Sequence, residues 1–187
     1  MESVPGTEGY RRSAQRFIEI SQALDFAKVC KDFLPFLPEV PSPILDIGSG
    51  AGQNAAALAE MGHIVTAVEP VTEFLAAAQI QYPAHNIVWI NDSLPSLERL
   101  RGTPTRFRFI LIDAVWHHLN PEERITAMRR LASQLSVGGR CALSLRNGPA
   151  GVGTRVYSTN VHETIRLAAT NGFNCLLSKE NQPSILP

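Results

Sequence analysis

The sequence has few cysteines, and their placement excludes two kinds of cysteine-based architecture. Three occur among 187 residues, and no two of them form a Cys-x-x-Cys pair. The three positions are Cys30, Cys141 and Cys175. An odd, scattered set is typical of buried free thiols in a reducing compartment, and it argues against a disulfide framework or a zinc site. We therefore expect no metal centre.

A surplus of charge of either sign is also absent. Lysine plus arginine and aspartate plus glutamate number 17 each, so the formal net charge is zero. Proteins that hold nucleic acids through phosphate contacts usually carry a basic surplus. The balance therefore favours a small-molecule ligand and predicts no nucleic-acid partner.

Long apolar runs are missing as well. The longest apolar stretches fall far short of the ~20 residues that a membrane-spanning helix needs. The first residues, MESVPGTEG, are acidic and polar where a signal peptide would carry an apolar run. These features predict a cytoplasmic protein without a membrane partner.

The hydrophobic pattern changes after a cluster of prolines. Between Tyr10 and Leu37 apolar residues recur at loosely helical spacing, and prolines at positions 35, 38, 41 and 43 end that pattern. Residues 1–41 are therefore predicted to form an N-terminal helical extension or lid. Residues 42–187 are predicted to form a Rossmann-like domain, so that the chain is a single domain overall.

Short apolar runs alternate with helical segments in this second part. The predicted strands are Ile44–Ile47, Ile64–Val68, Ile87–Ile90, Phe107–Ile112, Arg140–Leu145 and Phe173–Leu177. The predicted helices are Gln53–Met61, Val71–Gln81, Ser96–Leu100, Pro121–Leu135 and Val161–Asn171. Asn120 and Asn160, each followed three residues later by glutamate, mark two helix starts.

This alternation predicts an α/β fold with a doubly wound, mostly parallel sheet of about six strands. The crossovers that join parallel strands are right-handed. In such sheets ligands bind beyond the carboxyl ends of the strands, near the point where the strand order reverses. Functional residues are therefore expected directly after the predicted strands.

A glycine loop follows the first predicted strand and is the first candidate site. It reads DIGSGAGQ from Asp46 to Gln53, and glycines let a backbone turn tightly and approach a ligand. A dinucleotide fingerprint that begins at Gly48 would need glycine where Gln53 stands. Asp46 would also repel a pyrophosphate. The same carboxylate suits S-adenosylmethionine, which has no phosphate and carries an ammonium and a sulfonium.

Two further acids stand at the ends of the next predicted strands. Glu69 closes the second strand, where an acid can accept hydrogen bonds from both hydroxyls of a ribose. Asp92 follows the third strand beside Ser93, where a carboxylate can accept from an adenine amino group. Each acid alone is explained equally well as a solvated loop residue. Three acids at three successive strand ends favour a binding site.

Together these motifs resemble the class I S-adenosylmethionine-dependent methyltransferases of the small-molecule type. The resemblance covers about residues 42–146 and rests on the segments Leu45–Gly52, Val68–Pro70, Asn91–Ser93, Ile112–Leu119 and Leu135–Arg140. It implies that Asp46, Gly48 and Gly50 line the methionine end, Glu69 holds the ribose, Asp92 with Ser93 the adenine, and Asp113 the amino group. Ser49, Pro70 and Ala114 are the neighbouring cofactor-binding positions.

The resemblance also implies a feature that this sequence lacks. The family usually adds a seventh, antiparallel strand beside the fifth, and here only 178–187 follow the last apolar run. We expect that strand to be missing or shortened. An unpaired sheet edge favours pairing with another chain, so a homodimer is one expectation.

Methyl transfer from S-adenosylmethionine is an in-line displacement, in which the protein chiefly aligns acceptor and methyl group. His117 and His118 follow the fourth predicted strand, and a neutral imidazole there can take a proton from a hydroxyl or an amine. The alternative is a structural pair with one histidine packed under the next helix.

The acceptor side of the site is expected beyond the fourth and fifth strands. Trp116 is predicted to form a wall of the acceptor pocket. Arg146 and the later Arg155 and Tyr157 flank a glycine-containing loop, and either arginine can pair with an anionic group. A solvated connection explains the same loop equally well.

Two other functions remain open at this point. An NAD(P)-dependent oxidoreductase is opposed by Asp46 and by the missing third glycine. A non-catalytic S-adenosylmethionine-binding or regulatory module is compatible with a shortened sheet. The fourth strand ends in Asp113-Ala-Val-Trp, unlike the Pro-Pro motif of enzymes that methylate exocyclic amines of DNA bases. A small-molecule methyl acceptor is therefore predicted.

Overall fold

The computed structural model describes residue 4 and residues 6–83, 86–148 and 155–181, which contain a five-stranded sheet. The strands are β1 (Pro43–Ile47), β2 (Ile64–Val68), β3 (Ile87–Ile90), β4 (Phe107–Ile112) and β5 (Leu135–Leu143). They lie in the order β3-β2-β1-β4-β5, and all neighbouring pairs are parallel. The order reverses between β1 and β4, which is the switch point at which such sheets bind ligands. The predicted α/β, doubly wound fold is confirmed.

The central strand is covered on both faces, which explains its continuous apolar pattern. Ile44, Leu45 and Ile47 of β1 are at most 1% exposed, and Ile44 and Leu45 belong to cores on opposite sides of the sheet. Parallel strands buried in this way lack the alternation of polar and apolar residues seen in half-exposed strands. Asp46 interrupts this strand at 1% exposure. A carboxylate in that place breaks the packing pattern and points to function.

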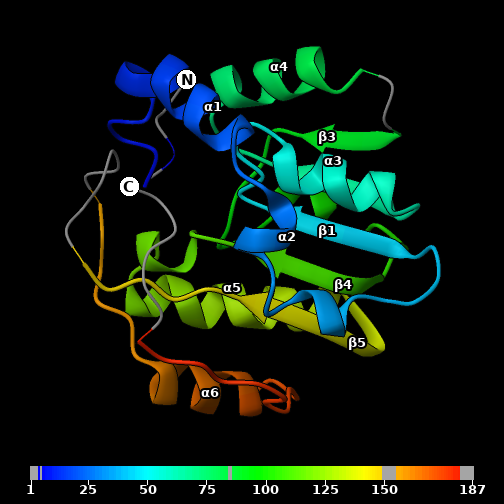
Figure 1. Cartoon of the computed structure of the whole chain (residues 1–187). Helices are drawn as coiled ribbons and strands as arrows, with labels where there is room; N and C mark the ends of the chain where they lie inside the picture. The colour runs from blue at the N-terminus through cyan, green and yellow to red at the C-terminus, as the bar shows by residue number, and fades with distance from the viewer. Residues whose placement is uncertain (1–3, 5, 84–85, 149–154, 182–187) are drawn as a thin grey trace.

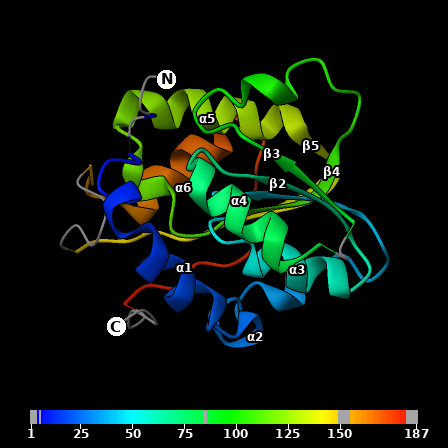
Figure 2. The same ribbon diagram turned by 90° about the horizontal axis from the view of Figure 1, so that it is seen from above.

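Helices cover both faces of the sheet (Figures 1 and 2). On one face lie α2 (Phe26–Val29) and α3 (Gln53–Glu60), and on the other α5 (Pro121–Gln134) and α6 (Val161–Ala169). Next to β3 lies α4 (Thr72–Gln81), and α1 (Ala14–Gln22) packs against α4. Single turns of 3-10 helix complete the list: η1 (Arg11–Ser13), η2 (Leu34–Phe36), η3 (Glu98–Leu100) and η4 (Trp116–His118).

The two predicted helix starts are confirmed. At α5 the Asn120 side chain accepts from the backbone N–H of Glu123 at 2.9 Å, and Glu123 accepts from the N–H of Asn120 at 2.8 Å. This reciprocal pair is a capping box. At α6 the Asn160 side chain accepts from the N–H of Glu163 at 3.0 Å. The predicted helix Ser96–Leu100, in contrast, shrinks to the single turn η3.

The prediction of a sixth strand is wrong. The segment Phe173–Leu177 pairs with no strand in the part of the chain that the structure describes. Its first residue, Phe173, packs against the core beneath α5. Lys179, just beyond the segment, donates a hydrogen bond to Asp32, which follows α2. The backbone N–H of Phe173 also donates to the carbonyl of Ala168 at the end of α6.

Two expectations about composition can also be compared with the structure. Cys30 is buried, whereas Cys175 is exposed, so the expected burial of all three thiols is wrong. Within the described ranges, no helix combines the length and the apolar character that crossing a membrane requires.

Candidate cofactor-binding site

The glycine loop between β1 and α3 turns sharply at the carboxyl end of β1. Gly48, Gly50 and Gly52 have φ values of 73°, 54° and 89°, a left-handed region that glycine reaches without strain. A Cβ at Gly48 would lie 2.2 Å from Cγ2 of Val115, so no side chain fits there. The loop therefore runs close under the segment that follows β4, as a ligand cradle at the switch point requires.

Glu69 joins the glycine loop to the loop after β2. Its Oε2 accepts from the N–H of Gly50 at 2.9 Å, and its Oε1 accepts from the N–H of Val71 at 2.8 Å. Glu69 is 5% exposed, and burial raises its pKa to about 7 although both N–H groups act in the opposite direction. A carboxylate has lone pairs beyond these two bonds. It can therefore also accept from ligand hydroxyls.

Asp46 and Asp113 complete a group of three carboxylates, of which Asp46 and Glu69 are buried and Asp113 is half-buried. Burial, reinforced by the negative charges of Asp113 and Glu69, raises the pKa of Asp46 to about 8. Its Oδ2 has no hydrogen-bond partner among the described residues. Asp113 accepts from the hydroxyl of Ser144 at 2.7 Å, and burial raises its pKa as well. Carboxylates held together away from water repel one another, and a cationic ligand would relieve that repulsion.

Asp92 lies in the loop after β3 and binds backbone groups of that loop. Its Oδ1 accepts from the N–H of Ser93 at 2.8 Å, and its Oδ2 accepts from the N–H of Arg99 at 2.7 Å. The preceding Asn91 donates to the carbonyl of Pro70 and to that of the residue before it, both at 3.1 Å. The loops after β2 and β3 are therefore joined, with the predicted ribose and adenine positions on neighbouring loops.

Two further predicted cofactor-binding residues, Ser49 and Ala114, lie at the same edge of the sheet. The hydroxyl of Ser49 is buried and has no hydrogen-bond partner among the described residues. Ala114 has a φ of 57°, and its N–H donates to the hydroxyl of Ser144 at 2.7 Å. Ser144, just beyond β5, thus connects Ala114 with Asp113. Sequence reasoning missed it, because a serine after a strand carries no distinctive signal.

The first two residues of η4 are buried. Trp116 is 0% exposed and belongs to the core under α5, and His117 is 1% exposed. A fully buried ring presents no surface to a ligand, which does not favour the predicted role of Trp116 as a pocket wall. Burial, followed by the positive charges of neighbouring side chains, lowers the pKa of His117 to about 3. Its Nδ1 has no hydrogen-bond partner among the described residues, and the near-complete burial of the ring favours a structural role over that of a general base.

His118 is held at both ring nitrogens. Its Nε2 lies 3.1 Å from the hydroxyl oxygen of Tyr10, and its Nδ1 lies 2.7 Å from the carbonyl oxygen of Arg155. Burial lowers its pKa below the usual value for histidine. A neutral imidazole has one N–H and one lone pair, and both are engaged here. The geometry supports a structural role for His118 more directly than a role as general base.

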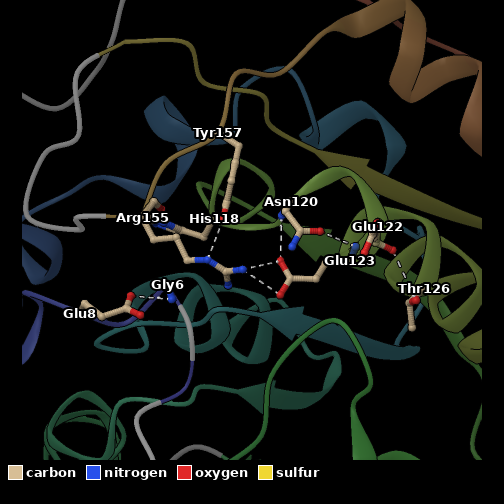
Figure 3. Close-up of polar contacts among 9 residues, drawn as sticks. All are labelled: Gly6, Glu8, His118, Asn120, Glu122, Glu123, Thr126, Arg155 and Tyr157. Carbon is tan, nitrogen blue, oxygen red and sulfur yellow. Dashed lines mark hydrogen bonds and ion pairs between the residues drawn. The ribbon is translucent and has the colours of Figure 1, made fainter.

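The predicted acceptor-side residues after β5 divide into two groups. Arg155 donates from one guanidinium nitrogen to both carboxylate oxygens of Glu123, at 3.0 and 3.1 Å, and from Nε to the Tyr157 hydroxyl at 3.1 Å (Figure 3). Arg155 and Tyr157 are therefore bound to α5 and to each other. The positive charge of Arg146, in contrast, lowers the pKa of Tyr10 and of both histidines of η4, which lie next to the site.

Two aromatic residues from the N-terminal segment reach the glycine loop. The ring of Phe17 lies 3.6 Å from the position that a Cβ of Gly50 would take, and it stacks on Phe74 of α4 at 4.7 Å between centroids. Tyr10 meets both rings edge-on, at 5.4 and 5.9 Å. Helical periodicity identified Phe17 as an apolar position, but nothing in the sequence placed it over this loop.

The fold and the site define a Rossmann-like protein with an acidic ligand site at the switch point. The chain belongs to the methyltransferase domain family, whose model matches residues 44–139. An uncharacterized methyltransferase of Mycobacterium tuberculosis is 32% identical over 111 residues, which cover 56% of this chain and 54% of that protein. The chain thus spans about half the length of the curated relatives it matches.

Solved methyltransferase structures share the fold. A TehB-like SAM-dependent methyltransferase from Corynebacterium glutamicum superposes with a TM-score of 0.63 at 20% identity, covering 87% of this chain and 82% of that one. The 1,6-didemethyltoxoflavin-N1-methyltransferase of Burkholderia thailandensis gives a TM-score of 0.67 at 22% identity, covering 92% and 76%. At these identities the similarity shows the fold alone.

Proposed function

We propose that this chain binds S-adenosylmethionine and transfers its methyl group to a small-molecule acceptor, leaving S-adenosylhomocysteine. The observation that carries this proposal is the group of buried carboxylates around the glycine loop. Asp46 keeps an unpartnered Oδ2 there, and its pKa is raised by burial and by the charges of its neighbours. Such a group disfavours phosphate and suits a ligand with an ammonium and a sulfonium.

The residues present fit this cofactor in three places. Asp46 and the backbone of Gly48 stand where the methionine end would lie, and Asp113 can accept from its ammonium. Glu69 has lone pairs left for ribose hydroxyls, and Asp92 lies on the next loop for the adenine. The cofactor supplies the leaving group, so the chain's own task is to hold acceptor and methyl in line.

We further propose that the acceptor carries an anionic group that faces Arg146. The positive charge of Arg146 lowers the pKa of Tyr10, His117 and His118, which supports a position near the segment that follows β4. Arg155, whose guanidinium pairs with Glu123, is the second candidate. No general base is assigned, since both ring nitrogens of His118 are engaged.

Calorimetric titration with S-adenosylhomocysteine tests the cofactor, with NADH and ATP as controls. We expect micromolar binding of S-adenosylhomocysteine alone. Glu69→Gln should weaken it about ten- to a hundredfold, because hydrogen bonds to a charged group contribute roughly 1.5–3 kcal/mol each. The exposed Glu39→Gln, with the same loss of charge, should leave it unchanged. Binding of NADH instead, or an unaffected Glu69→Gln variant, would refute the assignment.

A further inference from the structure

His118 is the junction between the N-terminal segment and the segment after β5. Its Nδ1 faces the carbonyl oxygen of Arg155 at 2.7 Å, and because a carbonyl only accepts, Nδ1 carries the proton. Nε2 of the neutral ring then holds a lone pair, so the Tyr10 hydroxyl, 3.1 Å away, donates to it. The contacts thereby define both the tautomer of His118 and the direction of the hydrogen bond from Tyr10.

The side of this junction that faces α5 is firmly held. Arg155 forms its two-oxygen ion pair with Glu123, and both side chains are 21% exposed (Figure 3). Glu123 in turn belongs to the capping box of α5 with Asn120. Paired arginine–carboxylate hydrogen bonds have a defined geometry. His118 is therefore anchored on a rigid element.

The other side of the junction is the N-terminal segment. Tyr10 packs edge-on against Phe17, and Phe17 lies over Gly50 in the glycine loop. The same segment passes close to the imidazole a second time, since a Cβ at Gly6 would lie 3.0 Å from Cβ of His118. The Tyr10 hydroxyl is thus the polar attachment between the segment that covers the glycine loop and the body of the domain.

We propose that Tyr10 is a positioning residue of the cofactor site: by donating its hydroxyl to His118 it fastens the N-terminal segment and holds Phe17 over the glycine loop. This inference rests on the proposed function, and it assigns a role to a residue that neither the motifs nor the family match includes. A single hydrogen bond of this kind shifts an equilibrium about two- to tenfold.

The surroundings of His118 favour a neutral imidazole, which can accept a hydrogen bond from the Tyr10 hydroxyl. Glu8 faces it from the N-terminal segment, Arg146 and Arg155 from the segments after β5, and His117 from its own turn. Burial is the largest influence and lowers the pKa of His118. The imidazole is therefore uncharged near neutral pH, as the hydrogen bond from the hydroxyl requires.

Tyr10→Phe tests the proposal, because it removes only the hydroxyl and keeps the ring against Phe17. We expect the S-adenosylhomocysteine affinity, measured by calorimetry, to fall about three- to tenfold. The ¹⁵N signal of Nε2 in His118 should shift, since it loses its donor, and amide exchange in α1 should accelerate. Tyr82→Phe, at the end of α4, is the matched control and should change none of these.

A double-mutant cycle separates this role from general packing. In a His118→Ala background, Tyr10→Phe should weaken binding by less than twofold, because the acceptor of the hydrogen bond is already gone. An equal loss in both backgrounds, or wild-type affinity with an unshifted Nε2 signal in the single variant, would overturn the proposal alone. Absence of S-adenosylhomocysteine binding by the wild-type chain would overturn the proposed function and this inference with it.

Discussion

Replacement of Asp46 by asparagine removes one charge from the acidic site and keeps the size of the side chain. In the folded protein the pKa of Asp46 is raised from 3.8 to about 8, first by burial and then by Asp113 and Glu69. As the pH rises, the unfolded chain loses this proton first, so folding stability falls with rising pH from about pH 4 to about pH 8. At pH 7 this difference costs on the order of 4 kcal/mol.

Asparagine cannot ionise, so Asp46→Asn should raise the free energy of unfolding at about pH 8 by roughly 1–4 kcal/mol and change it little at about pH 4. The same variant should bind S-adenosylmethionine at least tenfold more weakly. The loss for S-adenosylhomocysteine should be smaller, because that product lacks the sulfonium charge. The Asp46 carboxylate would then lower the folding stability of the protein while strengthening its binding of a cationic ligand.

Urea unfolding at the two pH values and calorimetry with both ligands measure these effects. Glu39→Gln, which removes one charge from an exposed position, is the control and should show no such pH dependence. A variant less stable than the wild type at about pH 8 would show that the carboxylate is satisfied in the fold. Equal losses for the two ligands would refute a direct effect on the sulfonium.

Two further predictions concern the architecture around the site. Gly48→Ala should destabilise the protein by about 1–3 kcal/mol more than Gly138→Ala in urea unfolding. Both glycines have φ near 72°. Only at Gly48, however, would a Cβ meet a side-chain methyl group, at 2.2 Å. Equal losses would contradict the close approach. Glu123→Gln should cost roughly 1–3 kcal/mol, since it breaks the half-buried pair with Arg155, whereas loss of the exposed pair in Glu98→Gln should cost under about 1 kcal/mol. Similar losses for the two glutamates would show that burial adds nothing to the first pair.

Local patterns in the sequence determined the fold class and indicated the acidic residues of the proposed cofactor site. Strand and helix periodicity depends on neighbouring residues, and so do the helix caps at Asn120 and Asn160. The carboxyl ends of parallel strands meet at one edge of the sheet. The positions of Asp46 and Glu69 along the chain therefore predicted that they lie near each other, as the electrostatic coupling of their side chains shows.

Only the tertiary structure shows how far the remaining predicted residues are buried and which distant groups they contact. Trp116 and His117 follow a strand end just as Asp113 does, but both are almost fully buried, and Trp116 belongs to the core under α5. The partners of His118 lie 108 and 37 positions away along the chain. No local pattern encodes such contacts, because they arise from packing between distant segments. Burial and long-range pairing, which only folding creates, therefore decided the roles of these side chains.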